Sequence, residues 1–431
     1  MHTSTFLSTR VHLPVVKRQR TGLQRQATSI QDRQEIPRLP QETGHVFVFG
    51  NGDTGQLGLG DEMLNRKKPM PLEVLNDKEI VDVACGGLHS IAITKDGHLW
   101  SWGCNDEGVL GRTGDEFKPG VVQQLEDVHI VKVACGDSIS MALSTEGKLY
   151  CWGTFRCAEG GLGFTRDVQK QEFPALVEQL RHDIIVDIAA GTDHCLALTD
   201  DGRIYGWGNG EQYQLGRRVI QRRKQNGLVP ELLRLRNVKA IGSGAYHSFA
   251  LTHENSLYVW GLNNYEQCGL LTDDNSTSPS IVTEPTLIRG LEGKGDIKSV
   301  VAGEHHSLVL MENGSLFSFG RADSSQLGVP PETITRYCSE GDSNFKKAIG
   351  YPLHIPNLEN VVEIKTGSNH AITTDQFGVA HTWGFGETYA LGNGSDEDEE
   401  VPVMLTGQKL EGHKVLRVAA GAQHSVILAR K

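Results

Sequence analysis

Short stretches of this chain alternate between apolar and polar residues, and one stretch recurs along most of its length. In residues 83–93, VACGGLHSIAI, a glycine is followed three places later by histidine and then by apolar residues. The form V-x-x-G-x-x-H-x-x-A-L occurs seven times, and its glycines are Gly86, Gly136, Gly191, Gly244, Gly303, Gly367 and Gly421. Period-two alternation predicts β-strands, and the recurrence predicts a fold built from copies of one unit.

An aromatic residue followed by glycine is the second repeated feature. Sixteen residues separate each shared glycine from the next such aromatic residue, six times out of six. Tight-turn dipeptides such as Asp96-Gly97 and Glu146-Gly147 divide most of these pieces, which predicts a β-hairpin. The aromatic residues are Phe49, Trp102, Trp152, Trp207, Trp260, Phe319 and Trp383.

Seven hairpins joined by 34 to 48 variable residues predict an all-β fold, a seven-bladed β-propeller over residues 45–431. The last repeat, residues 418–428, has no aromatic-glycine strand after it, and the first such strand, residues 45–50, has no repeat before it. Pairing of the N- and C-terminal strands would complete the seventh blade. The closed ring would then have no exposed sheet edge.

Residues 1–44 differ from the repeats in composition. They contain seven Lys or Arg against three Asp or Glu, although the whole chain carries a net charge of −11. We predict a basic, disordered tail on an acidic ring, and two different kinds of partner. The cluster of Lys17, Arg18 and Arg20 is typical of a nuclear localisation signal or a nucleic-acid contact, and equally of a solvated arm.

Several function classes are disfavoured. A histidine occupies the same position in six of the seven repeats, and we interpret it as a buried imidazole bonded to backbone. A metal ring is the alternative, but propeller blades hold equivalent residues far apart. We expect no metal, no cofactor and no membrane partner. No nucleophile, base and orienting acid group together, so a hydrolase is not expected, and a closed ring favours a monomer.

The loop after each aromatic-glycine pair has a nearly constant length. From the aromatic residue to the last glycine of the loop it spans nine residues in six copies and eleven in the third, residues 152–163. The extra residues bring Phe155, Arg156 and Glu159 between small residues. We predict a functional loop in blade three, with a neutral insertion as the alternative.

Function is also expected where the copies differ. The two residues after each shared glycine vary from blade to blade, and equivalent turns would bring them into a ring around one face. We predict a polar, partly acidic mouth suited to a basic protein partner, with solvated turns as the alternative. The predicted mouth residues are Asp137, Asp193, Tyr246, Glu304, His305 and Asn369.

Two further segments allow competing interpretations. The run GRRVIQRRK, residues 216–224, could contact phosphate or form a solvated loop. Gly50, Gly52 and Gly55 match G-x-G-x-x-G, but a nucleotide site of that kind needs a following helix. The repeat explains these glycines better as turn residues.

At this point the motifs resemble the regulator of chromosome condensation family over residues 45–431. Several stretches look like the members of that family that act as guanine nucleotide exchange factors for the small GTPase Ran. These stretches are FGNGDTGQLGLG from Phe49, GCNDEG from Gly103, CGDS from Cys135, WGTFR from Trp152 and GLNNY from Gly261.

The resemblance implies a propeller that binds Ran on one face and chromatin, through histones or DNA, on the other. It implies nuclear, chromatin-associated exchange of GDP for GTP that supports nucleocytoplasmic transport and spindle and nuclear envelope assembly. It does not imply covalent chemistry. A nuclear import receptor is a further expected partner, and a non-catalytic scaffold is the alternative function.

The resemblance also implies roles for single residues. A β-wedge that pushes against the GTPase corresponds to Phe155, Arg156, Cys157, Ala158, Glu159, Gly160, Gly161 and Leu162. Asp137, Asp193 and His305 match residues important for exchange, and Asp53 matches an acid on the side of histone contact. The chain departs from the family at residues 157–159, where Asp-Asn-Asn is usual, and at Ile139 and Glu266, where histidine is usual. The basic switchback loop is not evident before Val238.

Overall fold

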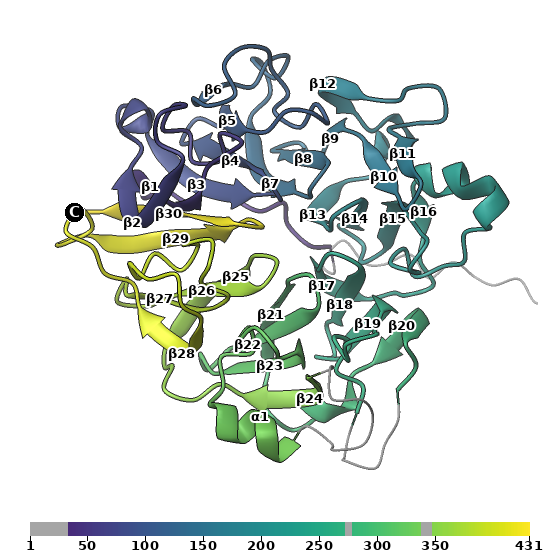
Figure 1. Cartoon of the computed structure of the whole chain (residues 1–431). Helices are drawn as coiled ribbons and strands as arrows, with labels where there is room; N and C mark the ends of the chain where they lie inside the picture. Colours follow the sequence, from purple (N-terminus) through teal and green to yellow (C-terminus); the bar gives the residue numbers. More distant parts are fainter. Residues whose placement is uncertain (1–32, 272–277, 338–346) are drawn as a thin grey trace, which may run out of the picture. The chain divides into compact units, whose positions relative to one another are not determined.

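The computed structural model describes residues 33–271, 278–337 and 347–431. Residues 34–431 form one compact unit, with seven four-stranded antiparallel sheets arranged as blades around a central channel (Figure 1). The predicted all-β, seven-bladed propeller is therefore confirmed. The predicted localisation cluster, Lys17, Arg18 and Arg20, lies outside the described residues.

Every blade has one inner strand at the channel and three strands outward from it. Blade one contains β29 (Lys414–Ala420), β30 (His424–Arg430), β1 (His45–Asn51) and β2 (Asn65–Pro71). Blade two contains β3 (Ile80–Cys85), β4 (His89–Thr94), β5 (Leu99–Gly103) and β6 (Gly120–Val121). Blade three contains β7 (Ile130–Cys135), β8 (Ile139–Ser144), β9 (Leu149–Gly153) and β12 (Gln171–Leu176). Blade four contains β13 (Ile185–Ala190), β14 (His194–Thr199), β15 (Ile204–Gly208) and β16 (Glu231–Leu232).

The remaining three blades follow the same plan. Blade five contains β17 (Val238–Ser243), β18 (His247–Thr252), β19 (Leu257–Leu262) and β20 (Ile281–Leu287). Blade six contains β21 (Ile297–Ala302), β22 (His306–Met311), β23 (Leu316–Arg321) and β24 (Ala348–His354). Blade seven contains β25 (Val361–Thr366), β26 (His370–Asp375), β27 (Ala380–Gly384) and β28 (Glu399–Met404).

Short helices occur only in the connections of the described chain. One is the α-helix α1 (Pro331–Tyr337), and four are 3-10 helices, η2 (Glu73–Leu75), η3 (Glu178–Leu180), η4 (Gln221–Leu228) and η5 (Arg289–Leu291). The G-x-G-x-x-G stretch continues into turns, as the interpretation from the repeat predicted.

The two ends of the propeller meet in blade one. Strand β1 pairs with β30 in an antiparallel register that runs from His45 opposite Ala429 to Gly50 opposite His424. Phe47 and Ile427 lie opposite each other in this pair, and both are buried in the core. The predicted closure by N- and C-terminal strands is therefore confirmed, and it removes the two edges of an open ring.

The repeated histidine and the repeated aromatic residue join neighbouring blades. His89 Nε2 in blade two lies 2.9 Å from Ser140 Oγ in blade three. Ser140 Oγ donates to the carbonyl of Val109 at 2.9 Å, and Trp152 Nε1 donates to the same carbonyl at 2.6 Å. The same histidine–serine pair joins His194 to Ser248, His247 to Ser307, His370 to Ser425 and His424 to Ser90.

This arrangement corrects the prediction of a backbone partner for the histidine. The histidine lies on the second strand of its blade, where the backbone N–H and C=O groups already pair with the strands on both sides. The imidazole therefore bonds a hydroxyl of the next blade instead. Each bond of this kind contributes about 1 kcal/mol net, and leaving its groups unpaired in the core would cost more.

Two blade boundaries depart from the pattern. At the histidine position of blade three stands Ile139, and the serine position of blade four facing it is Cys195; both are buried in one apolar cluster. His306 has no hydrogen-bond partner on either ring nitrogen among the described residues. The serine position of the next blade is Ala371, which has no hydroxyl to offer.

The shared glycines are required by close approach between blades. A Cβ on Gly86 would lie 2.2 Å from the carbonyl oxygen of Gly136 and 2.4 Å from Cε1 of His89. No side chain fits at those distances. Glycine recurs at this position because its backbone touches both the backbone of the next blade and the imidazole three residues later.

The structure differs from the prediction for residues 34–44, which we assigned to the tail. The backbone amide of Gln34 donates to the backbone carbonyl of Asp200 at 2.9 Å, and its side-chain Nε2 donates to the backbone carbonyl of Val238 at 2.7 Å. Ile36 and Leu39 pack against the core. Burial of these two apolar side chains holds the segment on the ring. The average composition of residues 1–44, from which we predicted a disordered tail, does not show the effect of two single residues.

Candidate functional site

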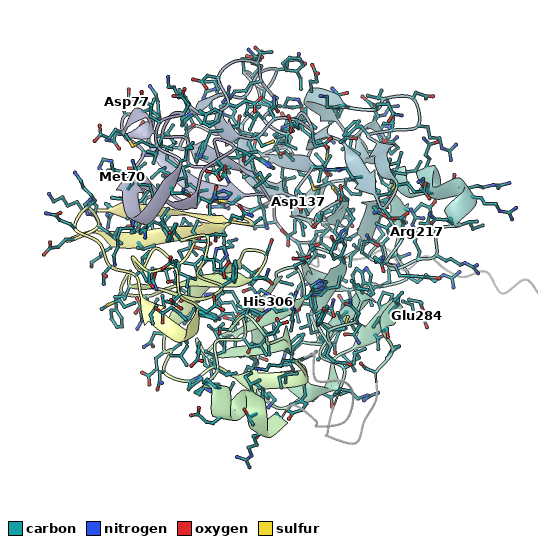
Figure 2. All side chains as sticks on the ribbon, in the orientation of Figure 1. Met70, Asp77, Asp137, Arg217, Glu284 and His306 are labelled. Carbon is teal, nitrogen blue, oxygen red and sulfur yellow. The ribbon has the colours of Figure 1, made fainter. Side chains whose placement is uncertain are left out.

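The variable turns after the shared glycines lie on one face of the propeller, which we call the wedge face. Backbone hydrogen bonds link these turns from blade to blade. The amide of Asp137 donates to Thr192 at 3.1 Å, and that of Glu304 donates to Ser368 at 3.0 Å. The predicted ring of turn residues is present, and Figure 2 shows Asp137 beside the centre of the ring.

The predicted mouth residues divide into two groups. Asp137 and Glu304 line the central channel, whose volume is about 570 Å³. Asp193, Tyr246, His305 and Asn369 do not line it, contrary to the prediction. The first residue of every turn lines the channel and the second does not, so the two residues of a turn face different surroundings.

The loop of blade three forms a separate hairpin. Strand β10 (Phe155–Cys157) pairs only with β11 (Gly160–Gly163), in a sheet that contains no other strand. The extra residues detected in the sequence thus form a projecting two-stranded element, here called the wedge. It begins directly after β9, whose end is held in the ring by the 2.8 Å bond from the amide of Thr154 to Ser138.

The wedge has a buried base and an exposed tip. Phe155 is fully buried, and Leu162 is 3% exposed, both in the same core cluster. The ring of Phe155 is stacked parallel to that of Phe164 with 6.5 Å between centroids. The assignment of Phe155 and Leu162 to a contact surface is therefore wrong, because these apolar side chains anchor the hairpin. Arg156, Ala158, Glu159 and Gly161 are exposed, and Cys157 and Gly160 are partly exposed.

Asp193 joins the turn ring to the base of the wedge. Its Oδ1 accepts a hydrogen bond from the backbone amide of Arg156 at 2.8 Å and another from the hydroxyl of Ser138. Burial raises the pKa of Asp193, against the lowering effect of these two hydrogen bonds. The guanidinium of Arg156 lies 3.4 Å from Glu107, an exposed contact of modest strength.

Asp137 is the most strongly perturbed carboxylate of the mouth. Its side chain is exposed to the channel, but protein atoms surround it and displace water. This desolvation, together with the negative charges of Asp193 and Glu304, raises the pKa of Asp137 to about 6. An incoming cationic or amide group would relieve that repulsion, which is the electrostatic property expected of a site for a basic surface.

His305 lies in an aromatic setting at the outer side of the mouth. Its ring centroid is 4.7 Å from that of Tyr265 and 6.2 Å from that of Tyr246. Its Nδ1 lies 3.3 Å from Gln267 Nε2, and its Nε2 lies 3.6 Å from Glu304. Burial, followed by the charge of Glu304, raises the pKa of Tyr246.

Asn369 carries a buried side-chain oxygen with no hydrogen-bond partner among the described residues. Asn369 occupies in blade seven the same turn position that Asp193 occupies in blade four and His305 in blade six. A buried acceptor without a donor is unfavourable in the free protein.

Asp53 lies on the wedge face and is exposed. Its loop follows β1, and the amide of Asn51, the last residue of β1, donates to the carbonyl of Gln423 in the turn ring at 2.9 Å. The described N-terminal segment lies at the other end of β1, where the amide of Gly44 donates to Ile80. Asp53 and the described residues before β1 therefore lie at opposite ends of this strand.

Three residues of the wedge face that contact predicted site residues had no role assigned from the sequence. Glu211 Oε2 accepts from the amide of Ala158 at 3.0 Å, and Lys224 Nζ bonds both Glu159 and Cys157. Tyr265 contacts His305. The basic composition of residues 216–224 is visible in the sequence. Nothing in the sequence indicates that Lys224, its last residue, contacts a hairpin 65 positions earlier.

The exposed wedge tip and the acidic mouth offer neighbouring surfaces to which a partner protein could bind. Among residues 33–271, 278–337 and 347–431, no three His, Cys, Asp or Glu side chains gather in a way that could hold a metal ion. None of the helices in these ranges has the length and apolarity to cross a bilayer. An acidic mouth beside a projecting hairpin is an arrangement for protein recognition.

Comparison with known proteins agrees with this architecture. The family model described as RCC1-like domain matches residues 45–427. The guanine nucleotide exchange factor SRM1 of Saccharomyces cerevisiae is 36% identical over 418 residues, covering 88% of this chain and 86% of that protein.

Two solved structures extend the agreement to the fold. One, reported with the binding properties of Prp20p from Saccharomyces cerevisiae to Gsp1p and histones, superposes with a TM-score of 0.86 at 37% identity, covering 92% of this chain and 93% of the other. The other, of Kap60 bound to yeast RCC1 (Prp20), gives 0.88 at 34% identity and covers 97% of each chain. By sequence, repeat structure and ring closure, the chain belongs to the RCC1-like domain family.

Proposed function

We propose that this protein is a guanine nucleotide exchange factor for the small GTPase Ran, acting in the nucleus on chromatin. The observation that carries the proposal is the pairing of a projecting wedge with an acidic mouth on one face. The relative with the name guanine nucleotide exchange factor matches this chain over most of both lengths, which supports the same activity here.

Exchange of this kind breaks no covalent bond. An exchange factor lowers the barrier to nucleotide release by binding the nucleotide-free GTPase more tightly than the loaded one. In this proposal the exposed tip of the wedge, Arg156 to Gly161, displaces the segments that hold phosphate and Mg²⁺. Phe155 and Leu162 serve it as anchors.

The two aspartates have different parts in the proposal. Asp137 faces the mouth with a raised pKa, and we assign it to bind basic or amide groups of the GTPase. Asp193 is bonded to the amide of Arg156, so we assign it to position the wedge. His305, Tyr246, Glu304 and Asn369 complete the docking surface.

Further partners follow from the relatives. Prp20p was characterised with its binding to Gsp1p and histones, and the second solved structure has Kap60 bound, so we propose chromatin and a nuclear import receptor as partners of this chain. The basic residues 1–33 are the proposed contact for them. In this setting exchange would load Ran with GTP at chromatin and support nucleocytoplasmic transport and spindle and nuclear envelope assembly.

The test is release of a fluorescent guanine nucleotide from purified Ran, with the full chain and with an Asp137→Ala, Asp193→Ala double variant. The full chain should accelerate release strongly and the folded double variant should not. A folded full chain without effect would favour the scaffold alternative. Acceleration by the double variant equal to that of the unsubstituted chain would overturn the residue assignment alone.

A further inference from the structure

The tip of the wedge has few contacts of its own. Strands β10 and β11 pair only with each other, and a Cβ added to Gly160 or Gly161 would meet no atom within 4 Å. A short isolated hairpin is marginal in water. The buried base fixes where the wedge starts, but it does not determine where the tip points.

Blade four supplies the missing contacts. Glu211, in the loop after β15, accepts the hydrogen bond from the amide of Ala158 at 3.0 Å. Lys224, in η4, donates to Cys157 Sγ at 3.2 Å and forms an ion pair with Glu159. The helix η4 is in contact with β11, and it lies beside the wedge in Figure 1.

Glu211 is itself held in place by its neighbours. Gln221 Nε2 donates to Glu211 Oε1 at 3.1 Å, and the amide of Glu211 donates to Asn209 Oδ1 at 2.9 Å. Partial burial acts to raise the pKa of Glu211, but the hydrogen bonds from Ala158 and Gln221 outweigh it and lower the pKa. Glu211 is therefore a charged acceptor at neutral pH.

We propose that Glu211 and Lys224 are positioning residues that brace the wedge tip in the orientation that engages the GTPase. The proposal rests on the proposed exchange function. It assigns a role to part of the basic segment at residues 216–224, and it concerns the place where this chain has Cys-Ala-Glu in the wedge. Glu159, unlike the usual asparagine there, offers a negative charge to Lys224.

The expected effect is on the population of one wedge orientation and not on folding. Exposed ion pairs add little to the stability of a fold. A partner that binds only one conformer has its apparent affinity lowered by the fraction of that conformer. Loss of the brace should therefore raise the KM for Ran and leave kcat nearly unchanged.

Kinetics with the full chain test this expectation. Lys224→Met and Glu211→Ala should each raise KM three- to tenfold, and a tenfold change corresponds to about 1.4 kcal/mol. The matched control is Arg223→Met, which removes a positive charge from the same helix at a residue without a hydrogen bond or ion pair to the wedge among the described residues. Its KM should stay within twofold of the unsubstituted protein.

A charge swap separates bracing from general electrostatics. Lys224→Glu alone should raise KM, and Lys224→Glu combined with Glu159→Lys should restore it, because the pair is re-formed with the charges exchanged. No restoration, or equal effects of Lys224→Met and Arg223→Met, would overturn the proposal.

Amide hydrogen exchange supplies a readout that does not depend on Ran. The wedge amides, Ala158 above all, should exchange faster in Lys224→Met and Glu211→Ala, with the rest of the ring unchanged. Unchanged protection of the wedge would overturn the brace even if the unsubstituted protein is an active exchange factor. If the two variants lose protection as expected but the unsubstituted protein does not accelerate nucleotide release, the proposed function is wrong and the contacts only support the structure of the wedge.

Discussion

Asp193 Oδ1 accepts the backbone amide hydrogen of Arg156 at 2.8 Å, which ties the turn ring of the propeller to the base of the wedge. The same oxygen accepts the hydroxyl of Ser138 from the neighbouring turn. One carboxylate thereby connects blade four, the turn of blade three and the hairpin that blade three projects.

Replacement of Asp193 should release the wedge base without unfolding the ring. Asp193→Ala removes a charged acceptor from two donors, and hydrogen bonds to charged groups contribute about 1.5–3 kcal/mol. We expect nucleotide release to slow by about ten- to a hundredfold, with the thermal midpoint little changed. Fluorescent nucleotide release and a melting curve on the same sample check this. If Asp193→Ala frees the wedge but nucleotide release keeps its normal rate, the bond between Asp193 and the wedge is not needed for exchange.

Exchange should depend on pH through Asp137. Desolvation and the charges of Asp193 and Glu304 raise its pKa to about 6, so the carboxylate is largely protonated below that pH in the folded protein. If the ionised form binds the GTPase, the exchange rate should rise as pH increases from 5 to 7. Asp137→Asn should be slower and should lack this rise, measured at constant ionic strength with Ran alone as the background.

Stability should show the opposite trend with pH. A carboxyl group with a raised folded-state pKa contributes stability below its unfolded value of 3.8, and this contribution is lost as pH rises through about 6. The free energy of unfolding of Asp137→Asn should therefore improve relative to the unsubstituted protein between pH 4 and pH 7. Urea titrations at both values measure it, and a constant difference would disprove the raised pKa.

Phe155 should behave as a core residue although it belongs to the wedge. Phe155→Ala removes a fully buried ring, and we expect a loss of about 3–5 kcal/mol in the free energy of unfolding. Arg156→Ala, next to it in sequence but exposed, should cost less than about 1 kcal/mol. Denaturant curves of the two variants decide the point. Equal, small losses would mean that Phe155 is a surface residue of the wedge after all.

The unpaired His306 offers a stabilising substitution. Ala371→Ser would place a hydroxyl where five other blade boundaries have a serine for the histidine, and we expect a gain of about 0.5–1.5 kcal/mol. The matched opposite is Ser425→Ala, which would leave His370 without its partner and should cost about 1–3 kcal/mol. Thermal melts of both compare them directly. A loss in both would mean that the packing around Ala371 leaves no room for a hydroxyl.

Much of the architecture could be predicted from the sequence because its determinants are local and repeated. The sixteen residues from Gly86 to Trp102 form one hairpin, and the first position is always glycine because backbone contact there leaves no room for a side chain. The wedge could be predicted because the loop after Trp152 spans eleven residues where the other six copies have nine. Ring closure through His45 and Ala429 followed from two incomplete ends.

Only the tertiary structure decided how the site is assembled. The first residue of each turn lines the channel and the second does not, so Asp137 faces the channel, whereas Asp193 bonds the wedge. Glu211 and Lys224 meet the tip across 53 and 65 positions of sequence. The sequence alone determined how many blades there are and where they differ. Contacts across a blade boundary depend on how two sheets pack, and no local spacing encodes which side chains then face each other.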